Sequence, residues 1–112
     1  MNRLGKNSAM TYRLEYISTF YTDVLQVIKN LEEYPQKAER ILSKLDKILI
    51  NLVYMPEMYP VYEAFPIFRK IAIEDYLTFY IVNKRDRLIE IHRLLYSRMD
   101  IAKQFKYINL GE

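Results

Sequence analysis

The chain has 112 residues, and its 17 Lys and Arg outnumber its 14 Asp and Glu, which gives a formal net charge of +3. This length, with 51% hydrophobic residues, predicts one compact domain around a single core. The sequence contains no cysteine, which excludes disulfide scaffolds, thiolate zinc sites and cysteine nucleophiles. The mild positive charge favours polyanionic partners without identifying one.

The start of the chain is polar and has no periodic pattern. Residues 1–11 are therefore expected to form a flexible arm, in which Met10 could be the original start and residues 1–9 an extension. The arm lacks the apolar stretch of a secretory signal, and no apolar run approaches the roughly 20 residues that span a bilayer. We expect a cytoplasmic protein with no membrane partner, a domain over 12–105 and a loose tail over 106–112.

The first half of the domain predicts a strand followed by two helices. Apolar and charged residues alternate over Tyr12–Ile17, as in a half-buried strand. Ser18 and Thr19 then offer a helix N-cap. Helical spacing continues through Phe20, Val24, Val27, Ile28 and Leu31.

Pro35 ends the first helix and suits the first turn of the next one. The second helix carries an apolar seam close to that of a coiled coil: Ala38, Ile41, Leu42, Leu45, Ile48, Leu49 and Leu52. The two helices should form an antiparallel hairpin. Beside the seam, Lys37, Arg40, Lys44 and Lys47 form a basic stripe, which is either a phosphate-binding surface or, our preferred interpretation, a solvated helix face.

The second half of the domain predicts three strands. Two prolines make 55–60 a loop, and apolar strands follow over 68–73, 77–82 and 88–96, separated by short polar turns. Residues 98–105 predict one or two helical turns. The expected fold is α+β, with the order β-α-α-β-β-β and a mainly antiparallel sheet that packs against the helical hairpin on one face. On strand alternation, Arg93 shares a face with Ile89, Ile91 and Leu95, toward the helices.

This order resembles the RelE/ParE superfamily of type II toxins. The matching motifs lie in the last three strands: Arg69 opens the second strand, a Tyr-rich strand follows over 75–82, and the fourth strand ends in a basic turn over 94–100. Tyr96 stands where the family most often has histidine. The resemblance implies a growth-inhibiting toxin that a cognate antitoxin neutralises in a hetero-oligomeric complex. A disordered antitoxin segment is expected to fold, as a helix or an added strand, into an apolar groove beside the helical hairpin.

The resemblance also implies a candidate active site. RelE-like toxins are ribosome-dependent mRNA endoribonucleases that need cations on the phosphate and an acid–base pair, without a metal or other cofactor. Arg69 and Arg98 match the family's phosphate-binding positions, Lys70 lies at or next to a catalytic lysine, and Tyr96 is the candidate acid or base. For each of these residues the alternative is an ordinary surface or half-buried side chain.

Two departures favour a different target. Leu77 stands where RelE-like nucleases carry an arginine, and Ala72 where a second lysine is expected. ParE-like members, which inhibit DNA gyrase without cleaving anything, also lack this set. Because the nucleases are the more frequent members of the superfamily, the resemblance slightly favours mRNA cleavage, with gyrase inhibition and an inactive interaction module as alternatives. His92, the sole histidine, does not align with the family's histidine, and a structural role is favoured for both His92 and Arg93.

Overall fold

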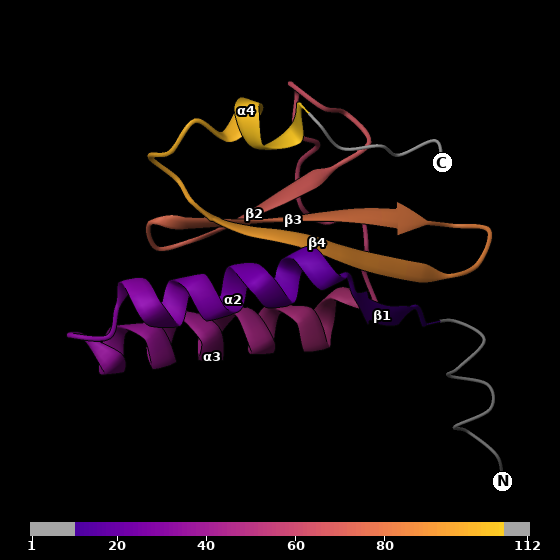
Figure 1. The fold of residues 1–112 in the computed structure, drawn as a ribbon. Coiled ribbons are helices and arrows are strands. Elements are labelled where there is room, and N and C mark those ends of the chain that lie inside the picture. The colour runs from indigo at the N-terminus through magenta and orange to yellow at the C-terminus, as the bar shows by residue number, and fades with distance from the viewer. Residues whose placement is uncertain (1–10, 107–112) are drawn as a thin grey trace, which may run out of the picture.

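The computed structural model describes residues 11–106, so the predicted arm over 1–11 and tail over 106–112 lie outside the described residues except at 11 and 106. The elements follow the predicted order, with a short helix after the last strand (Figure 1). They are β1 (Arg13–Tyr16), α2 (Ser18–Asn30), α3 (Pro35–Leu52), β2 (Arg69–Ile73), β3 (Tyr76–Asn83), β4 (Leu88–Tyr96) and α4 (Ile101–Phe105).

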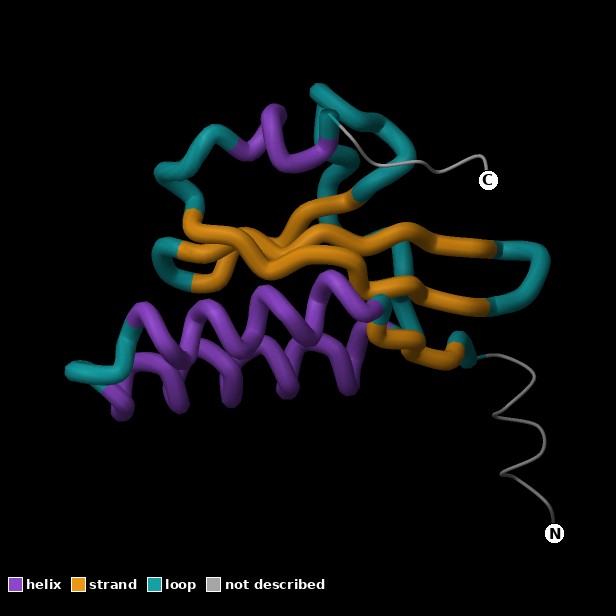
Figure 2. The backbone as a smooth tube through the Cα atoms, in the orientation of Figure 1, coloured by secondary structure: helices purple, strands orange, loops and turns teal. Residues whose placement is uncertain are grey.

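The four strands form one mixed sheet in the order β1-β4-β3-β2. The pairs β2–β3 and β3–β4 are antiparallel, as their short polar turns predict. β1 pairs in parallel with β4. The helical hairpin, β2 and β3 lie between these two strands in the sequence. The backbone trace in Figure 2 shows the hairpin on one side of this sheet and α4 on the other.

The predicted α+β fold is confirmed, and the helical hairpin covers one face of the sheet. Pro35 occupies the first turn of α3, as predicted. The core on this side joins the helix seam to the strands, with Ile41, Leu45, Leu49, Leu52, Ile71, Tyr80, Ile89 and Ile91 among its buried members. Within the described residues, no helix is long and apolar enough to cross a membrane.

The predicted N-cap of the first helix is wrong. Ile17 is the N-cap residue, and no side chain caps this end. The amide of Ile17 donates to the carbonyl of Ile91 at 2.9 Å, which continues the β1–β4 pairing into the helix start. The Thr19 hydroxyl instead donates to the carbonyl of His92 at 2.8 Å. Tertiary pairing with β4 thus determines where the helix begins.

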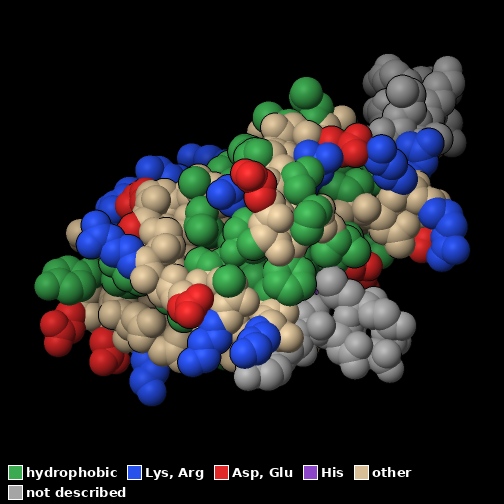
Figure 3. Space-filling model, turned by 90° about the horizontal axis from the view of Figure 1, so that it is seen from above, with side chains coloured by type: hydrophobic (Ala, Val, Ile, Leu, Met, Phe, Trp, Pro, Cys, Tyr) green, Lys and Arg blue, Asp and Glu red, His purple; other side chains and the backbone are tan. Residues whose placement is uncertain are grey.

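The second face of the sheet has its own core, which the sequence pattern did not predict. Phe68, Phe79, Leu95 and Phe105 are buried there, and partly buried residues from α4 and the loop before β2 pack around them. The ring centroids of Phe68 and Phe105 lie 4.7 Å apart, within the range of favourable aromatic contacts. Figure 3 shows hydrophobic side chains over the middle of this face and Lys and Arg toward its ends.

A β-bulge in β4 explains how Leu95 reaches this second core. Phe79 pairs with Arg93 and Tyr80 pairs with Ile91, so His92 is an extra residue in β4. One extra residue reverses the alternation beyond it. Leu95, predicted on the helix face with Ile91, therefore lies on the opposite face, and this prediction was wrong. Leu94 takes the place against the helices.

Arg93 joins three elements just after the bulge. Its Nε donates to Oδ2 of Asp23 on α2 at 2.7 Å, and its Nη2 donates to Oδ1 at 3.1 Å. The amide of Leu94 donates to the same Oδ2 at 2.9 Å. Nη2 also reaches Oε1 of Gln104 on α4, at 3.4 Å. The predicted structural role of Arg93 thus takes the form of a nearly buried ion pair between α2, β4 and α4.

The basic stripe of α3 is largely neutralised by the β2–β3 turn. Glu74 adopts a left-handed backbone conformation (φ 54°) and receives a two-pronged contact from Arg40, at 2.7 and 2.8 Å, and a third from Lys44 at 3.0 Å. Hydrogen bonding to these cations lowers the pKa of Glu74 to about 2. Lys37 bonds Asp75 at 3.0 Å. These contacts tie the hairpin to the sheet.

Replacing Asp23→Asn should destabilise the fold by about 3 kcal/mol, because it leaves the Arg93 cation without its counter-charge in a low-dielectric site. Urea unfolding measures the change. The matched control is Asp46→Asn, because Asp46 is an exposed aspartate on α3. This change should alter stability by less than about 0.5 kcal/mol. Equal effects of the two changes would contradict a role for the ion pair.

Candidate functional site

Two of the four predicted site residues, Tyr96 and Arg98, lie together at one end of the sheet. Tyr96 ends β4 and is 39% exposed, and its ring centroid lies 5.6 Å from that of Tyr76. Burial, followed by the charge of Asp75, raises the pKa of Tyr76. Arg98 is exposed in the next turn and makes no ion pair with any described residue. Both side chains are open to a ligand.

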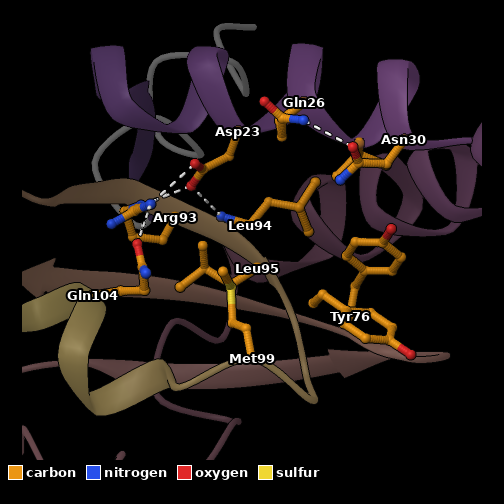
Figure 4. Close-up of a pocket in the computed structure, with 11 residues that line it drawn as sticks. Asp23, Gln26, Asn30, Tyr76, Arg93, Leu94, Leu95, Met99 and Gln104 are labelled. Atoms are coloured by element: carbon orange, nitrogen blue, oxygen red, sulfur yellow. Dashed lines mark hydrogen bonds and ion pairs between the residues drawn. The ribbon is translucent and has the colours of Figure 1, made fainter.

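Tyr96 borders a pocket of about 200 Å³ between α2, the end of β4 and α4. Asp23 of α2 extends toward Arg93 and Leu94 of β4, and Gln26 and Asn30 follow it along the helix (Figure 4). Met99 and Gln104 also line the pocket. Some of these groups are already engaged, since Gln26 Nε2 donates to Oδ1 of Asn30 at 2.8 Å and Asp23 accepts from Arg93. The pocket therefore offers amide groups and an exposed tyrosine.

The other two predicted residues lie far from this pocket. Arg69 pairs across β2–β3 with Tyr80, whereas Tyr96 pairs with Tyr76 across β3–β4. This register separates Arg69 from Tyr96 by about 13 Å along the strand direction and about 10 Å across the sheet. Arg69 and Lys70 are consecutive in a strand, so their side chains leave opposite faces. The structure does not gather the four residues around one phosphate.

Arg69 is engaged in holding the loop before its own strand. Nη1 donates to the carbonyls of Tyr59 at 2.7 Å and Glu57 at 3.2 Å. Tyr80 adds a bond from its hydroxyl to the carbonyl of Pro56 at 2.7 Å. Burial raises the pKa of Tyr80 to about 12, against the lowering effect of the Arg69 cation. The tyrosine thus stays protonated and keeps donating this bond at neutral pH.

The side chain of Lys70 projects from the face of the sheet that carries the second core. Its ammonium lies 5.7 Å from the ring centroid of Tyr62, at cation–π distance. Ala72 has the same strand parity and pairs with Leu77, which packs against the second core. In addition to Arg69 and Arg98, the resemblance implies cations at positions 70, 72 and 77, and of these three only residue 70 is a cation.

His92 is also engaged in structure. Nε2 lies 3.1 Å from Oε1 of Glu90, and the ring meets Phe68 edge-on, with centroids 5.3 Å apart. It sits at the bulge, which agrees with the structural role favoured from the sequence. Among the described residues, no cluster of three or more His, Cys, Asp or Glu could hold a metal ion.

A second candidate site lies between the two long helices. A groove of about 210 Å³ is lined by Tyr16, Phe20, Val24, Leu42, Leu45, Asp46 and Leu49. Three exposed apolar residues on α2 extend it: Tyr21, Leu25 and Ile28. They are spaced four and three residues apart and so form one stripe. Sequence reasoning assigned Ile28 to the core stripe and overlooked Tyr21 and Leu25, although their presence makes the apolar face of α2 wider than a buried stripe needs.

The family model described as "ParE toxin of type II toxin-antitoxin system, parDE" matches residues 15–101. Solved structures share the fold at low identity. The chromosomal ParDE system of P. aeruginosa matches with TM-score 0.63 and 14% identity, covering 76% of this chain and 95% of that chain. The isolated E. coli RelE toxin matches with TM-score 0.57 and 14% identity, covering 83% of this chain and 93% of that chain. A comparison with curated proteins gives no match.

The fold is therefore that of the RelE/ParE superfamily of type II toxins. Within this superfamily, the chain belongs to the ParE toxin family.

Arg69→Ala should destabilise the fold by about 1–3 kcal/mol, because the carbonyls of Glu57 and Tyr59 lose their donor. Amide exchange should accelerate over 55–60, which mass spectrometry or NMR would measure. Arg98→Ala is the control, since an exposed arginine without an ion pair in the described residues should contribute less than about 0.5 kcal/mol. If Arg69→Ala leaves both stability and exchange unchanged, the loop does not depend on this guanidinium.

Proposed function

We propose that this chain inhibits growth as the toxin of a type II toxin–antitoxin pair, and that it acts by binding its target, DNA gyrase, without cleaving RNA. The observation that carries this proposal is the second face of the sheet. The positions of Lys70, Ala72 and Leu77, where RelE-like nucleases place cations, share this face with an aromatic core. An apolar floor with one cation is poorly suited to stabilising a crowded phosphate.

The gyrase assignment rests on the family match and on the absence of cations at positions 72 and 77. Ribosome-dependent mRNA cleavage is the second candidate, and the exposed pair Tyr96 and Arg98 favours it. A tyrosine next to an arginine can serve in proton transfer and phosphate binding. The geometry weighs against this candidate, because Arg69 is committed to the loop and lies across the sheet from Tyr96.

Induced expression and purified assays separate the two candidates. We expect toxicity with broken DNA in induced cells, inhibition of gyrase supercoiling by the purified protein, and intact mRNA in translating extracts. Leu77→Arg should add no cleavage, because residue 77 and Tyr96 lie on opposite faces of the sheet.

New mRNA 5′ ends in the extract would overturn the gyrase proposal. In that case Arg98→Ala should slow cleavage by about 10²-fold, a typical cost of losing one transition-state contact. Normal growth at high expression with neither effect would favour an inactive interaction module.

We further propose that the groove between α2 and α3 receives the cognate antitoxin as a helix. The groove is apolar at its floor, and Tyr21, Leu25 and Ile28 extend it at the spacing that a helix partner matches. An antitoxin segment that folds on binding would bury these side chains. Its association should then have a large negative heat-capacity change.

Leu25→Asp should weaken the complex with the antitoxin at least 10-fold and leave the free toxin as stable as before, since Leu25 is 67% exposed. Calorimetry with the product of a neighbouring short reading frame measures both affinity and heat capacity. Tyr34→Asp, at a residue 64% exposed in the hairpin turn, is the control and should bind normally. If the unchanged toxin, Leu25→Asp and Tyr34→Asp bind the antitoxin equally tightly, the antitoxin does not occupy the groove between α2 and α3.

A further inference from the structure

The long loop over 53–68, between α3 and β2, is held rigidly in its first half. Loops of this length without helix or strand are uncommon and are usually functional or disordered. Here the carbonyls of Pro56, Glu57 and Tyr59 accept side-chain bonds from β2 and β3. The Pro60 carbonyl accepts from the amide of Lys70 at 3.0 Å. The loop is thus ordered by bonds to its backbone.

Tyr59 of this ordered segment packs against the core, but three other side chains of the segment are exposed. Tyr54 is 65% exposed, Met55 59% and Met58 52%. Methionine is among the residues most often buried, so two exposed methionines beside an exposed tyrosine on a fixed backbone need a physical reason. The contacts that hold the loop use its carbonyls and leave these three side chains free of the core.

The β3–β4 turn, which carries three cations, lies beside the loop that carries this exposed apolar group. Lys84, in the β3–β4 turn, bonds Oε2 of Glu57 in the loop at 3.0 Å, which brings the turn beside the loop. Arg87 in the same turn accepts a backbone bond from Arg13 at 2.9 Å. Both arginines are exposed, and neither forms an ion pair with a carboxylate in residues 11–106. Arg85 is 88% exposed and has a single 3.4 Å contact, to its neighbour Asp86.

We propose that these residues form a second interaction surface, which binds an acidic protein segment that carries apolar side chains. The surface, here called the loop corner, consists of Tyr54, Met55, Met58, Lys84, Arg85 and Arg87, with Arg13 at its border. Methionines adapt to varied apolar partners, and the cations around them complement Asp and Glu. A nucleic acid would use the cations and stack on the tyrosine, but it has nothing apolar to place against two methionines.

The loop corner is separate from the groove between α2 and α3, and the proposal does not depend on the antitoxin or on gyrase. None of its residues lines that groove or the pocket at Tyr96. The corner also differs from the basic stripe of α3, where Glu74 and Asp75 already pair with Lys37, Arg40 and Lys44. At the loop corner Lys84 and Arg85 contact Glu57 and Asp86, whereas Arg13 and Arg87 form no ion pair within residues 11–106.

The test titrates the ¹⁵N-labelled full chain with three probes followed by NMR. They are a 12-residue peptide of Glu, Asp, Leu and Phe, the same peptide with Ser in place of Leu and Phe, and a 12-nucleotide single-stranded DNA. We expect the first peptide to bind most tightly, with shifts at 54–58 and 84–87. The double change Met55→Ser and Met58→Ser should weaken binding of the first peptide at least 10-fold. The double change Arg85→Ser and Arg87→Ser should also weaken binding of this peptide and make its affinity less dependent on salt. Tyr34→Ser, equally exposed elsewhere, should have no effect.

Several results would overturn the proposal. One is equal binding of the serine peptide or the DNA, insensitive to the methionine changes, because the corner would then be a plain polyanion-binding patch. Others are the absence of binding at millimolar peptide, or shifts confined to the groove between the helices. Because the readout is binding at mapped residues, none of these results bears on toxicity or antitoxin binding.

Discussion

The ion pair between Asp23 and Arg93 determines how the elements fit together. Asp23 receives three hydrogen bonds, two from the Arg93 guanidinium and one from the amide of Leu94. A nearly buried carboxylate is tolerable only when paired and hydrogen-bonded in this way. The contact fixes α2 against β4 at the point where the strand leaves regular pairing. Through Gln104 it also reaches α4, so one guanidinium links elements on both faces of the sheet.

The bulge at His92 lets a single strand serve two cores. Before the bulge, Ile89 and Ile91 contribute to the helix side, and after it Leu94 does so while Leu95 enters the aromatic core. Without the extra residue, regular alternation would direct Leu95 toward α2, where Leu94 now packs. The aromatic core occupies the same face as Lys70, Ala72 and Leu77.

Periodicity predicted the order of the elements, the helical hairpin and the whole of β4, because these depend on neighbouring residues. The second core was not predictable in this way, since it unites Phe68 from a loop end with Phe105 from a short terminal helix. The bulge arises from pairing between strands, and the ion pair joins residues 70 positions apart. The same holds for Arg69, whose position matched a family motif while its guanidinium binds loop carbonyls that no pattern places beside it.

The distribution of charge shows why a net value says little about partners. The formal charge of +3 is consistent with a general attraction to polyanions, yet three of the four cations in the most regular basic stripe are paired with Glu74 and Asp75. Their role is to bind the hairpin to the sheet. Other exposed cations lie in turns, at the loop corner and beside Tyr96, and on the helices, as Lys29 and Lys47 do. Partner recognition therefore depends on which cations the fold leaves unpaired, and that follows from strand register and turn conformation more than from composition.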